Sequence, residues 1–280
     1  MGTAVEHETD QATPENPPAE AGGWSFPGRT LFGITVHAVT MADTLRIAGE
    51  AIARRKPLAI GVVNVAKIVK LQSDAEVRAS ILDSDLVLAD GAPVVWSSRL
   101  LRRPLPERVA GIDVFERLLA AAGEHGYRVY FLGATQEVLD AVIERALREH
   151  PGLIVAGSQH GYFKNEQMGE VANAVCASGA DVLFVAMTTP KKEIFLREVS
   201  QRGVIPVTHG VGGSFDVYSG KTKRAPVWMQ KSGLEWFYRV LQEPGRMWKR
   251  YLVTNTLFLL LLARNMVRPM APFEPEHADA

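Results

Sequence analysis

Six short runs of apolar, β-prone residues alternate with longer stretches of helical spacing, and this alternation limits the fold more than any other feature. The runs lie at 58–64, 85–89, 127–133, 153–157, 180–187 and 204–210. Helical spacing follows in segments such as 135–150 and 165–179. Strands that alternate with helices of about ten or more residues are typical of a parallel sheet covered on both faces. We therefore predict an α/β fold with a largely parallel sheet and helices on both faces, plus a helical C-terminal appendage.

The two ends of the chain differ from its middle in composition. The first 27 residues contain five acids, four prolines and no Lys or Arg. They offer too little apolar surface to offset the entropy of ordering, so residues 1–28 are predicted to be a disordered tail. They also lack the basic start and apolar core of a signal peptide, so we do not expect export. We predict a catalytic α/β domain at 29–225, an appendage at 226–268 and a second disordered tail at 269–280.

Several functional classes are disfavoured by motifs that the sequence lacks. No G-x-G-x-x-G follows a predicted strand, and neither a P-loop nor a G-x-S-x-G motif is present. The seven histidines are scattered without metal-ligand spacing, so no metal or other cofactor is expected. His160 and His209 fall at predicted strand ends and are interpreted as packing or supporting residues. The single cysteine, Cys176, cannot form an intramolecular disulfide, which fits a reducing cytosol.

One carboxylate directly follows a predicted strand. Asp90 comes after the run at 85–89 and precedes Gly91, which allows a sharp turn into the predicted helix at 93–101. Ligands of such sheets bind outside the carboxyl ends of the strands, so Asp90 is well placed to act as a general base. The alternative is that Asp90 only caps the following helix, since Asp is a favoured N-cap residue. Its position alone leaves both interpretations open.

Small or polar residues follow the other predicted strands as well. They are Asn64, Gly133 with Ala134, and the segments 161–163, 188–193 and 211–216. The carboxyl ends of parallel strands meet at one edge, where a phosphorylated ligand can approach backbone N–H groups. This recurrence favours a functional role for Asp90.

Several longer motifs carry a family resemblance. They are "ADGAPVVW", "RPLPERVAGIDVF", "YFLGATQEV", "HPGLIVAGSQHGYF", "PKKE" and "KRAPVWMQKSGLEWFYRVLQEPGRMWKRY". Over residues 30–262 the chain resembles the WecG/TagA/CpsF glycosyltransferases. The resemblance implies an inverting, metal-independent hexosyl- or N-acetylhexosaminyltransferase. It would move a sugar from a UDP-sugar to a lipid-linked, polyprenyl-diphosphate saccharide in exopolysaccharide or cell-wall polymer synthesis.

The resemblance also implies roles for particular residues. Asp90 would be the general base, Arg108 would help form the sugar pocket, and the basic side chains of the C-terminal segment would close over the diphosphate. That basic set is Arg239, Arg246, Lys249 and Arg250, and the remaining expected substrate-binding residues are Asn64, Gly133, Lys192 and Glu193. A carboxylate can take the proton of an attacking hydroxyl, and arginine forks match phosphate oxygens. Alternatively, Arg108 is a structural partner of Asp113 or Glu107.

Two positions depart from the family pattern. Val62 replaces a threonine in "VVNVAK", and Lys192 stands at the glutamine position of "PKKE". Both are expected in the sugar pocket, so the donor need not be N-acetylmannosamine.

The C-terminal segment is strongly basic although the whole chain has no net charge. Residues 221–268 contain ten Lys/Arg and two Glu, a formal charge of +8. On one continuous helix, the five arginines at 239, 246, 250, 264 and 268 would share a narrow face, although Pro244 interrupts the first part.

An apolar run at 251–263 lies within this basic segment. Its 13 residues are fewer than the roughly 20 that span a bilayer. A buried core helix is one alternative, and nucleic-acid binding through Trp236, Trp248 and Tyr251 is another. The basic, aromatic-bearing pattern favours a segment in a membrane interface, and the leucine run argues against nucleic acid. We therefore expect a cytoplasmic protein, peripheral at the anionic inner face of the cell membrane, with a possible homo-oligomeric state.

A second functional class remains open at this point. The chain could instead be a non-enzymatic nucleotide- or anion-binding module with a membrane-interaction tail. An enzyme should slowly release UDP from its donor without acceptor, whereas a module should only bind it.

Overall fold

The computed structural model describes residues 23–274, apart from the side chains of Lys231, Arg246 and Met247. The predicted tail residues 1–22 and 275–280 lie outside the described part of the chain.

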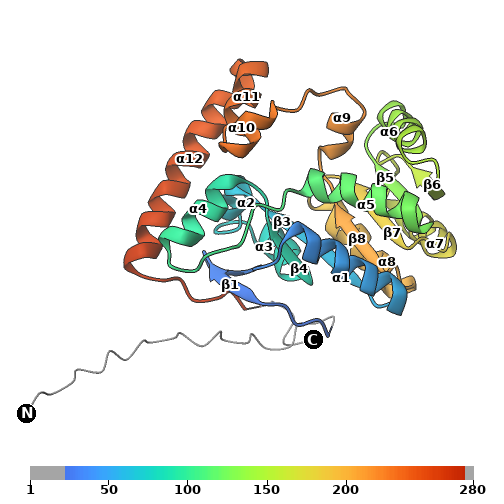
Figure 1. The fold of residues 1–280 in the computed structure, drawn as a ribbon, viewed down its shortest axis with the longest axis horizontal. Coiled ribbons are helices and arrows are strands. Elements are labelled where there is room, and N and C mark those ends of the chain that lie inside the picture. The colour runs from blue at the N-terminus through green and yellow to red at the C-terminus, as the bar shows by residue number, and fades with distance from the viewer. Residues whose placement is uncertain (1–22, 275–280) are drawn as a thin grey trace, which may run out of the picture.

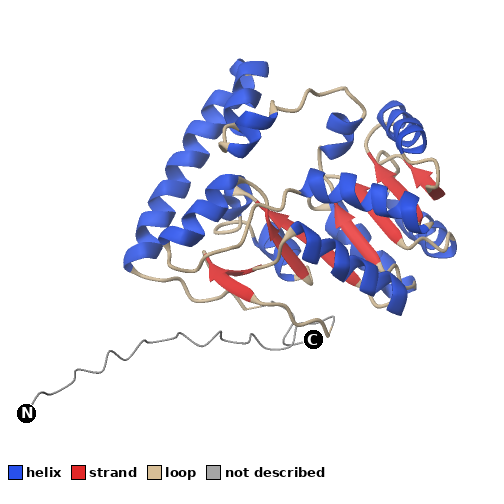
Figure 2. Ribbon diagram, in the orientation of Figure 1, coloured by secondary structure: helices blue, strands red, loops and turns tan. Residues whose placement is uncertain are grey.

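A six-stranded, wholly parallel sheet forms the centre of the molecule (Figure 2). Its strands are β3 (Leu58–Val63), β4 (Leu86–Ala89), β5 (Arg128–Gly133), β6 (Ile154–Gln159), β7 (Val182–Ala186) and β8 (Val207–Gly210). Their order across the sheet is β4-β3-β8-β7-β5-β6. Each of the six predicted runs forms one of these strands, and the predicted α/β fold is confirmed.

Helices cover both faces of this sheet. One face packs against α1 (Met41–Arg54), α5 (Gly111–His125), α6 (Gln136–Glu149) and α9 (Ser214–Tyr218). The other packs against α2 (Val65–Lys70), α3 (Ala75–Leu82), α4 (Ala92–Leu100), α7 (Met168–Ala177) and α8 (Lys191–Arg202), with a short 3₁₀ helix, η1 (Asn165–Gln167), before α7. Strand β5 shows the alternation behind this: Val129 and Phe131 enter one core cluster, and Tyr130 and Leu132 enter the opposite one.

A small antiparallel hairpin was not anticipated from the sequence. Strands β1 (Gly28–Leu31) and β2 (Ile34–His37) pair with each other, and β2 packs near β4. His37 is buried, and its Nδ1 accepts a hydrogen bond from the backbone N of Val87 at 2.8 Å. Each strand has only four residues, so the alternating pattern is too short to stand out.

The packed part of the chain extends closer to both termini than the composition predicts. Trp24 and Phe26, in the expected tail 1–28, are buried, and Trp24 Nε1 donates to Pro57 O at 2.7 Å. In the expected tail 269–280, Phe273 packs against the core and donates its backbone N–H to Gly33 O at 2.7 Å. The predicted tail boundaries at residues 28 and 269 therefore lie too far inside the chain. A single buried aromatic side chain removes enough apolar surface from water to anchor a polar segment.

After α9, the described chain forms α10 (Val227–Lys231), α11 (Glu235–Gln242) and α12 (Pro244–Val267) (Figure 1). Helix α12 lies against α2, and its Phe258 and Leu262 are buried in the core cluster of that face. The Phe258 ring lies 5.4 Å from that of Phe32. The C-terminal helices therefore pack on the α/β body along one side of α12.

The helix is interrupted between α11 and α12, so the five arginines do not share one face of a single continuous helix. Glu243 leaves helical geometry (φ −135°, ψ 66°) and Pro244 begins α12. Arg239 is therefore on a different helix from Arg250 and Arg264, and Arg268 follows the end of α12. Among the described residues, no helix is both long enough and apolar enough to cross a membrane.

Candidate functional site

Asp90 lies at the carboxyl end of β4 and does not cap the helix that follows. Its backbone N–H donates to Val63 O of the neighbouring strand at 2.8 Å, which continues the sheet to the edge. The N-cap of α4 is Gly91, at a φ of 114°, and within the described chain no side chain caps this helix. The capping interpretation of Asp90 is therefore wrong, and its carboxylate is free for another role.

The charges of four side chains act on the Asp90 carboxylate. The pKa of Asp90 is raised to about 6: burial and then the charge of Glu235 raise it, while Arg108, Lys67 and Arg239 oppose the rise. The four neighbours come from the loop before α5, from α2 and from α11. A carboxylate with a pKa near neutrality accepts a proton better than an ordinary aspartate and is still ionised at pH 7.

Arg108 lies between the α/β body and helix α11. Its Nη2 donates to Asp113 Oδ2 at 3.0 Å, and its Nη1 lies 3.5 Å from Glu235 Oε1. The sequence-based alternative of an Asp113 partner is therefore realised, whereas Glu107 instead accepts the backbone N–H of Met41. Nη1 is buried and has no hydrogen-bond partner within the described residues. Asp113 thus holds Arg108 in place through Nη2, and Nη1 can still donate a hydrogen bond to a ligand oxygen.

Two lysines lie at the carboxyl edge of the sheet: Lys67 acts on Asp90, and Lys192 acts on Lys67. Lys67 Nζ donates to Val62 O at 2.7 Å, and burial, followed by the charge of Lys192, lowers the pKa of Lys67 to about 8. Lys192 lies across Gly210, where an added Cβ would meet its Cδ at 3.1 Å. Sequence reasoning missed Lys67. The available signal was its place in the first turn of the helix after β3, one turn beyond Asn64.

Glu193 is held against Lys192 by a 3.0 Å ion pair. Its Oε1 also accepts a hydrogen bond from Thr189 Oγ1 at 3.1 Å. Its Oε2 is buried without a hydrogen-bond partner in the described part of the chain. Lys192 and Glu193, both expected to bind substrate, therefore lie close enough to Lys67 for their charges to act on it, and Lys67 in turn acts on Asp90.

The structure gives three other residues packing or capping roles. Asn64 Oδ1 caps α2 by accepting from Lys67 N at 3.1 Å. Gly133 has a φ of 118°, and an added Cβ would collide with the backbone of Ala186. Val62 is buried against Gly111 and does not face the charged side chains around Asp90. Of the two departures from the family pattern, only Lys192 therefore belongs to this set of charged residues.

The basic residues of the C-terminal helices are distributed unevenly around the site. Arg239, on α11, is close enough for its charge to act on Asp90. Lys249 and Arg250, on α12, are exposed, and Lys249 Nζ lies 5.6 Å from the centre of the Trp248 ring. No described contact brings these two to Asp90. The side chain of Arg246 lies outside the described residues.

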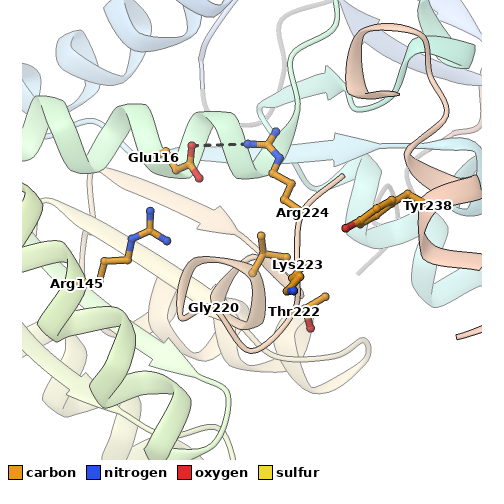
Figure 3. Close-up of a pocket in the computed structure, with 8 residues that line it drawn as sticks. Glu116, Arg145, Gly220, Thr222, Lys223, Arg224 and Tyr238 are labelled. Carbon is orange, nitrogen blue, oxygen red and sulfur yellow. Dashed lines mark ion pairs between the residues drawn. The ribbon is translucent and has the colours of Figure 1, made fainter. Parts of the chain in front are cut away.

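A cavity of about 430 Å³ is lined by side chains from α5, α6, α9, α11 and the segment after α9 (Figure 3). Its lining residues are Glu116, Arg145, Val217, Gly220, Thr222, Lys223, Arg224 and Tyr238. Figure 3 shows Arg224 turned toward Glu116, with a 3.7 Å ion pair between them, and Arg145 and Tyr238 on opposite sides. Arg224 also pairs with Asp113, the partner of Arg108, so the cavity and the Asp90 group share one network. Sequence reasoning missed this network.

The two histidines at strand ends have supporting roles, as expected. His209 is buried, with Nδ1 3.1 Å from Ile60 O and Nε2 3.0 Å from Gly111 O, and it therefore links β3 to the start of α5. His160 Nδ1 accepts the backbone N–H of Tyr162 at 3.1 Å. Within residues 23–274, no group of three or more His, Cys, Asp or Glu side chains is placed to hold a metal ion.

A parallel α/β sheet with a raised-pKa carboxylate and several cations at its carboxyl edge suits an enzyme that moves a polar group from an anionic donor. A sequence model of the Glycosyl transferase WecG/TagA/CpsF family matches residues 29–272, and the chain belongs to this family. It is therefore a glycosyltransferase rather than a non-enzymatic binding module. It is 42% identical over 175 residues to an N-acetylglucosaminyldiphosphoundecaprenol N-acetyl-beta-D-mannosaminyltransferase of Bacillus spizizenii, over 62% of this chain and 67% of the relative.

Proposed function

We propose that this chain transfers a sugar, with inversion, from a UDP-sugar to a saccharide linked through a diphosphate to a polyprenyl lipid. The product would enter a cell-surface polysaccharide. The name of the Bacillus spizizenii relative, which specifies a diphosphoundecaprenol-linked N-acetylglucosamine acceptor, supports the acceptor class. The observation that carries the proposal is the Asp90 carboxylate, which lies at the sheet edge with its pKa raised to about 6 among four charged side chains.

In this proposal Asp90 is the general base. An acceptor hydroxyl loses its proton to the carboxylate while its oxygen attacks the anomeric carbon of the donor sugar. The C–O bond to UDP breaks on the opposite face, and UDP leaves with the electron pair. Positioned bases of this kind contribute roughly 10²- to 10⁴-fold to the rate.

Cationic side chains would stabilise the negative charge that develops on the leaving diphosphate. Arg239 is the described member of the C-terminal basic set whose charge already reaches the site. Arg108 can offer Nη1, which is buried without a hydrogen-bond partner in the described chain. Bidentate contact of arginine with phosphate oxygens makes both suited to this charge. Arg246, Lys249 and Arg250 complete the proposed set, and Lys249 and Arg250, which are exposed on the packed helix α12, would have to turn toward the diphosphate when it binds.

The donor sugar would lie beside Lys192 and Glu193. Lys192 carries a charge where the family pattern has a neutral glutamine, but Glu193 partly neutralises it at 3.0 Å. A sugar with hydroxyl groups can satisfy both partners, because it offers hydrogen-bond donors and acceptors together. Asn64 and Gly133 would contribute to substrate binding indirectly, by setting the backbone conformation at the ends of β3 and β5.

Helix α12 would bring the enzyme to its lipid-linked acceptor at the inner face of the cell membrane. Its exposed apolar side chains include a central patch of Leu252, Val253, Leu257, Leu259 and Leu260. Lys249 and Arg250 precede this patch and Arg264 follows it. An apolar patch bordered by cations fits the interface of an anionic membrane, where each juxtamembrane cation contributes about 1 kcal/mol.

The test is a transfer assay with purified protein, polyprenyl-diphosphate N-acetylglucosamine in anionic vesicles and a panel of labelled UDP-sugars. We expect one donor to give a labelled lipid product and equimolar UDP. A panel that binds but yields neither lipid product nor UDP would overturn the proposal.

A further inference from the structure

Glu235 is the first residue of α11 and pairs with Nη1 of Arg108, whereas Asp113 accepts from Nη2. Its side chain is 32% exposed and that of Arg108 is 20% exposed, so the pair is only partly hydrated. Its Oε1 lies 3.5 Å from Arg108 Nη1, which is an ion pair without a hydrogen bond. A buried guanidinium nitrogen is costly to leave without an acceptor, so the Glu235 charge is its main compensation.

The remaining contacts fix Arg108 on the α/β body. Asp113 holds Nη2 at 3.0 Å, and Arg224 in turn pairs with Asp113. Arg108 is therefore anchored independently of α11. Glu235 adds a contact from the C-terminal helices to a side chain that is already rigid, which makes Arg108 the docking point for α11.

Glu235 and Arg108 also act on Asp90 in opposite senses. The charge of Glu235 favours the protonated form of Asp90, whereas Arg108 favours the ionised form. Lys67, from α2, and Arg239, one turn further along α11, act in the same sense as Arg108. Among these described groups, Glu235 is the single negative charge. The backbone places Arg108 beside Asp90, because Val109 N, one residue after Arg108, donates to Ala89 O, one residue before Asp90, at 2.9 Å. A negative charge paired with Arg108 weakens the hold of this cation on the ionised form of Asp90, which keeps Asp90 basic.

We propose that Glu235 is a positioning residue that docks helix α11 on Arg108 and, through this shared neighbour, couples the seating of α11 to the base Asp90. The base is then fully tuned only when the C-terminal helices are in place over the site. This inference rests on the proposed role of Asp90 as general base. Its own test also uses readouts that do not depend on transfer.

The experiment compares the full-length wild-type protein with Glu235→Gln, which keeps the shape of the side chain and removes its charge. Transfer is followed as kcat/KM against pH, and the Asp90 carboxyl is titrated by NMR on protein labelled at the aspartate side-chain carbon. Hydrogen exchange reports how firmly α11 is seated. Glu137→Gln is the matched control, because Glu137 is an exposed glutamate in the first turn of α6 and so shares the same relation to a helix N-terminus.

For Glu235→Gln, we expect the acid limb of the pH profile, the pH range in which kcat/KM rises, to move toward lower pH. The midpoint of the Asp90 titration should move with it. Exchange in 235–242 should rise, and kcat/KM at pH 7.5 should fall by roughly threefold to tenfold. Glu235→Asp, which keeps the charge, should restore most of the limb position, and Glu137→Gln should change none of these measurements.

Two results would count against different claims. An unchanged Asp90 titration in Glu235→Gln, or a loss of activity with the acid limb in its wild-type position, would overturn the coupling and leave Glu235 purely structural. A wild-type protein that transfers no sugar, but whose Asp90 titration still responds to Glu235, would overturn the proposed base and leave the electrostatic coupling intact.

Discussion

Asp113 accepts a hydrogen bond from Arg108 at 3.0 Å across the first turn of α5. The same carboxylate pairs through its other oxygen with Arg224, 111 residues further along the chain. One aspartate therefore joins the segment before α5 to the segment that leads into the C-terminal helices. It also orients a guanidinium that acts on Asp90.

Replacing Asp113 by Asn should release both arginines. We expect kcat/KM to fall by about tenfold or more, since Arg108 loses its fixed orientation. The free energy of unfolding should fall by about 1–3 kcal/mol, because hydrogen bonds to charged groups are lost. Steady-state kinetics and denaturant unfolding measure the two effects. Wild-type kinetics in a destabilised variant would show that the network supports only the fold.

Replacing Asp90 by Asn should remove the proposed base and keep the fold. We expect transfer to fall by about 10²-fold or more, with UDP affinity within about twofold of wild type. In the wild type, activity should rise with pH through about 6, because the base must be ionised. Pre-steady-state transfer and UDP titration are the measurements, and transfer by the Asn variant at the wild-type rate would refute the role.

The same substitution has a consequence for stability that depends on pH. Asp90 holds its proton more tightly when folded, with a pKa of about 6 against 3.8, so its contribution to folding is lost as pH rises through this interval. Asn carries no charge, so at pH 8 Asp90→Asn should be more stable than wild type by up to about 3 kcal/mol. The difference should vanish below pH about 4. Thermal unfolding at pH 4 and pH 8 tests this, and equal stability at pH 8 would contradict the burial of the charge.

Lys67 should act on Asp90 in the sense opposite to Glu235. Its positive charge favours the ionised carboxylate, so Lys67→Met should move the acid limb of the pH profile toward higher pH. Lys70→Met is the matched control, since Lys70 lies on the same helix, is 59% exposed and pairs with Asp74. A limb that moves equally in both variants, or in neither, would show that Lys67 is not coupled to Asp90.

The sequence predicted the sheet and the position of Asp90 for one physical reason. Runs of buried β-prone residues mark strands, and a polar residue directly after such a run falls at the carboxyl edge. The Asp113–Arg224 pair and the Lys67–Asp90 proximity were not predictable in this way, because they depend on how distant helices pack. The sequence likewise could not predict which side of α12 packs on Phe32, because the leucine run is apolar on all sides.

The two sides of α12 offer a test of the membrane proposal. Leu259 and Leu260 are each 63% exposed, whereas Leu262 is 9% exposed and lies in the core cluster with Phe32. The double variant Leu259→Ser/Leu260→Ser should therefore keep its melting temperature and lose affinity for anionic vesicles, with transfer to a soluble acceptor analogue unchanged.

Leu262→Ser is the matched control from the inner side of the same helix. It should cost about 2–5 kcal/mol of folding free energy, because it removes buried apolar contacts and leaves a cavity. Flotation on vesicles and thermal unfolding measure the two effects separately. If the double variant floats as well as wild type, the exposed leucines do not bind the membrane. The acceptor would then have to be reached through the flanking cations alone, and binding would disappear at high salt because exposed charges are screened.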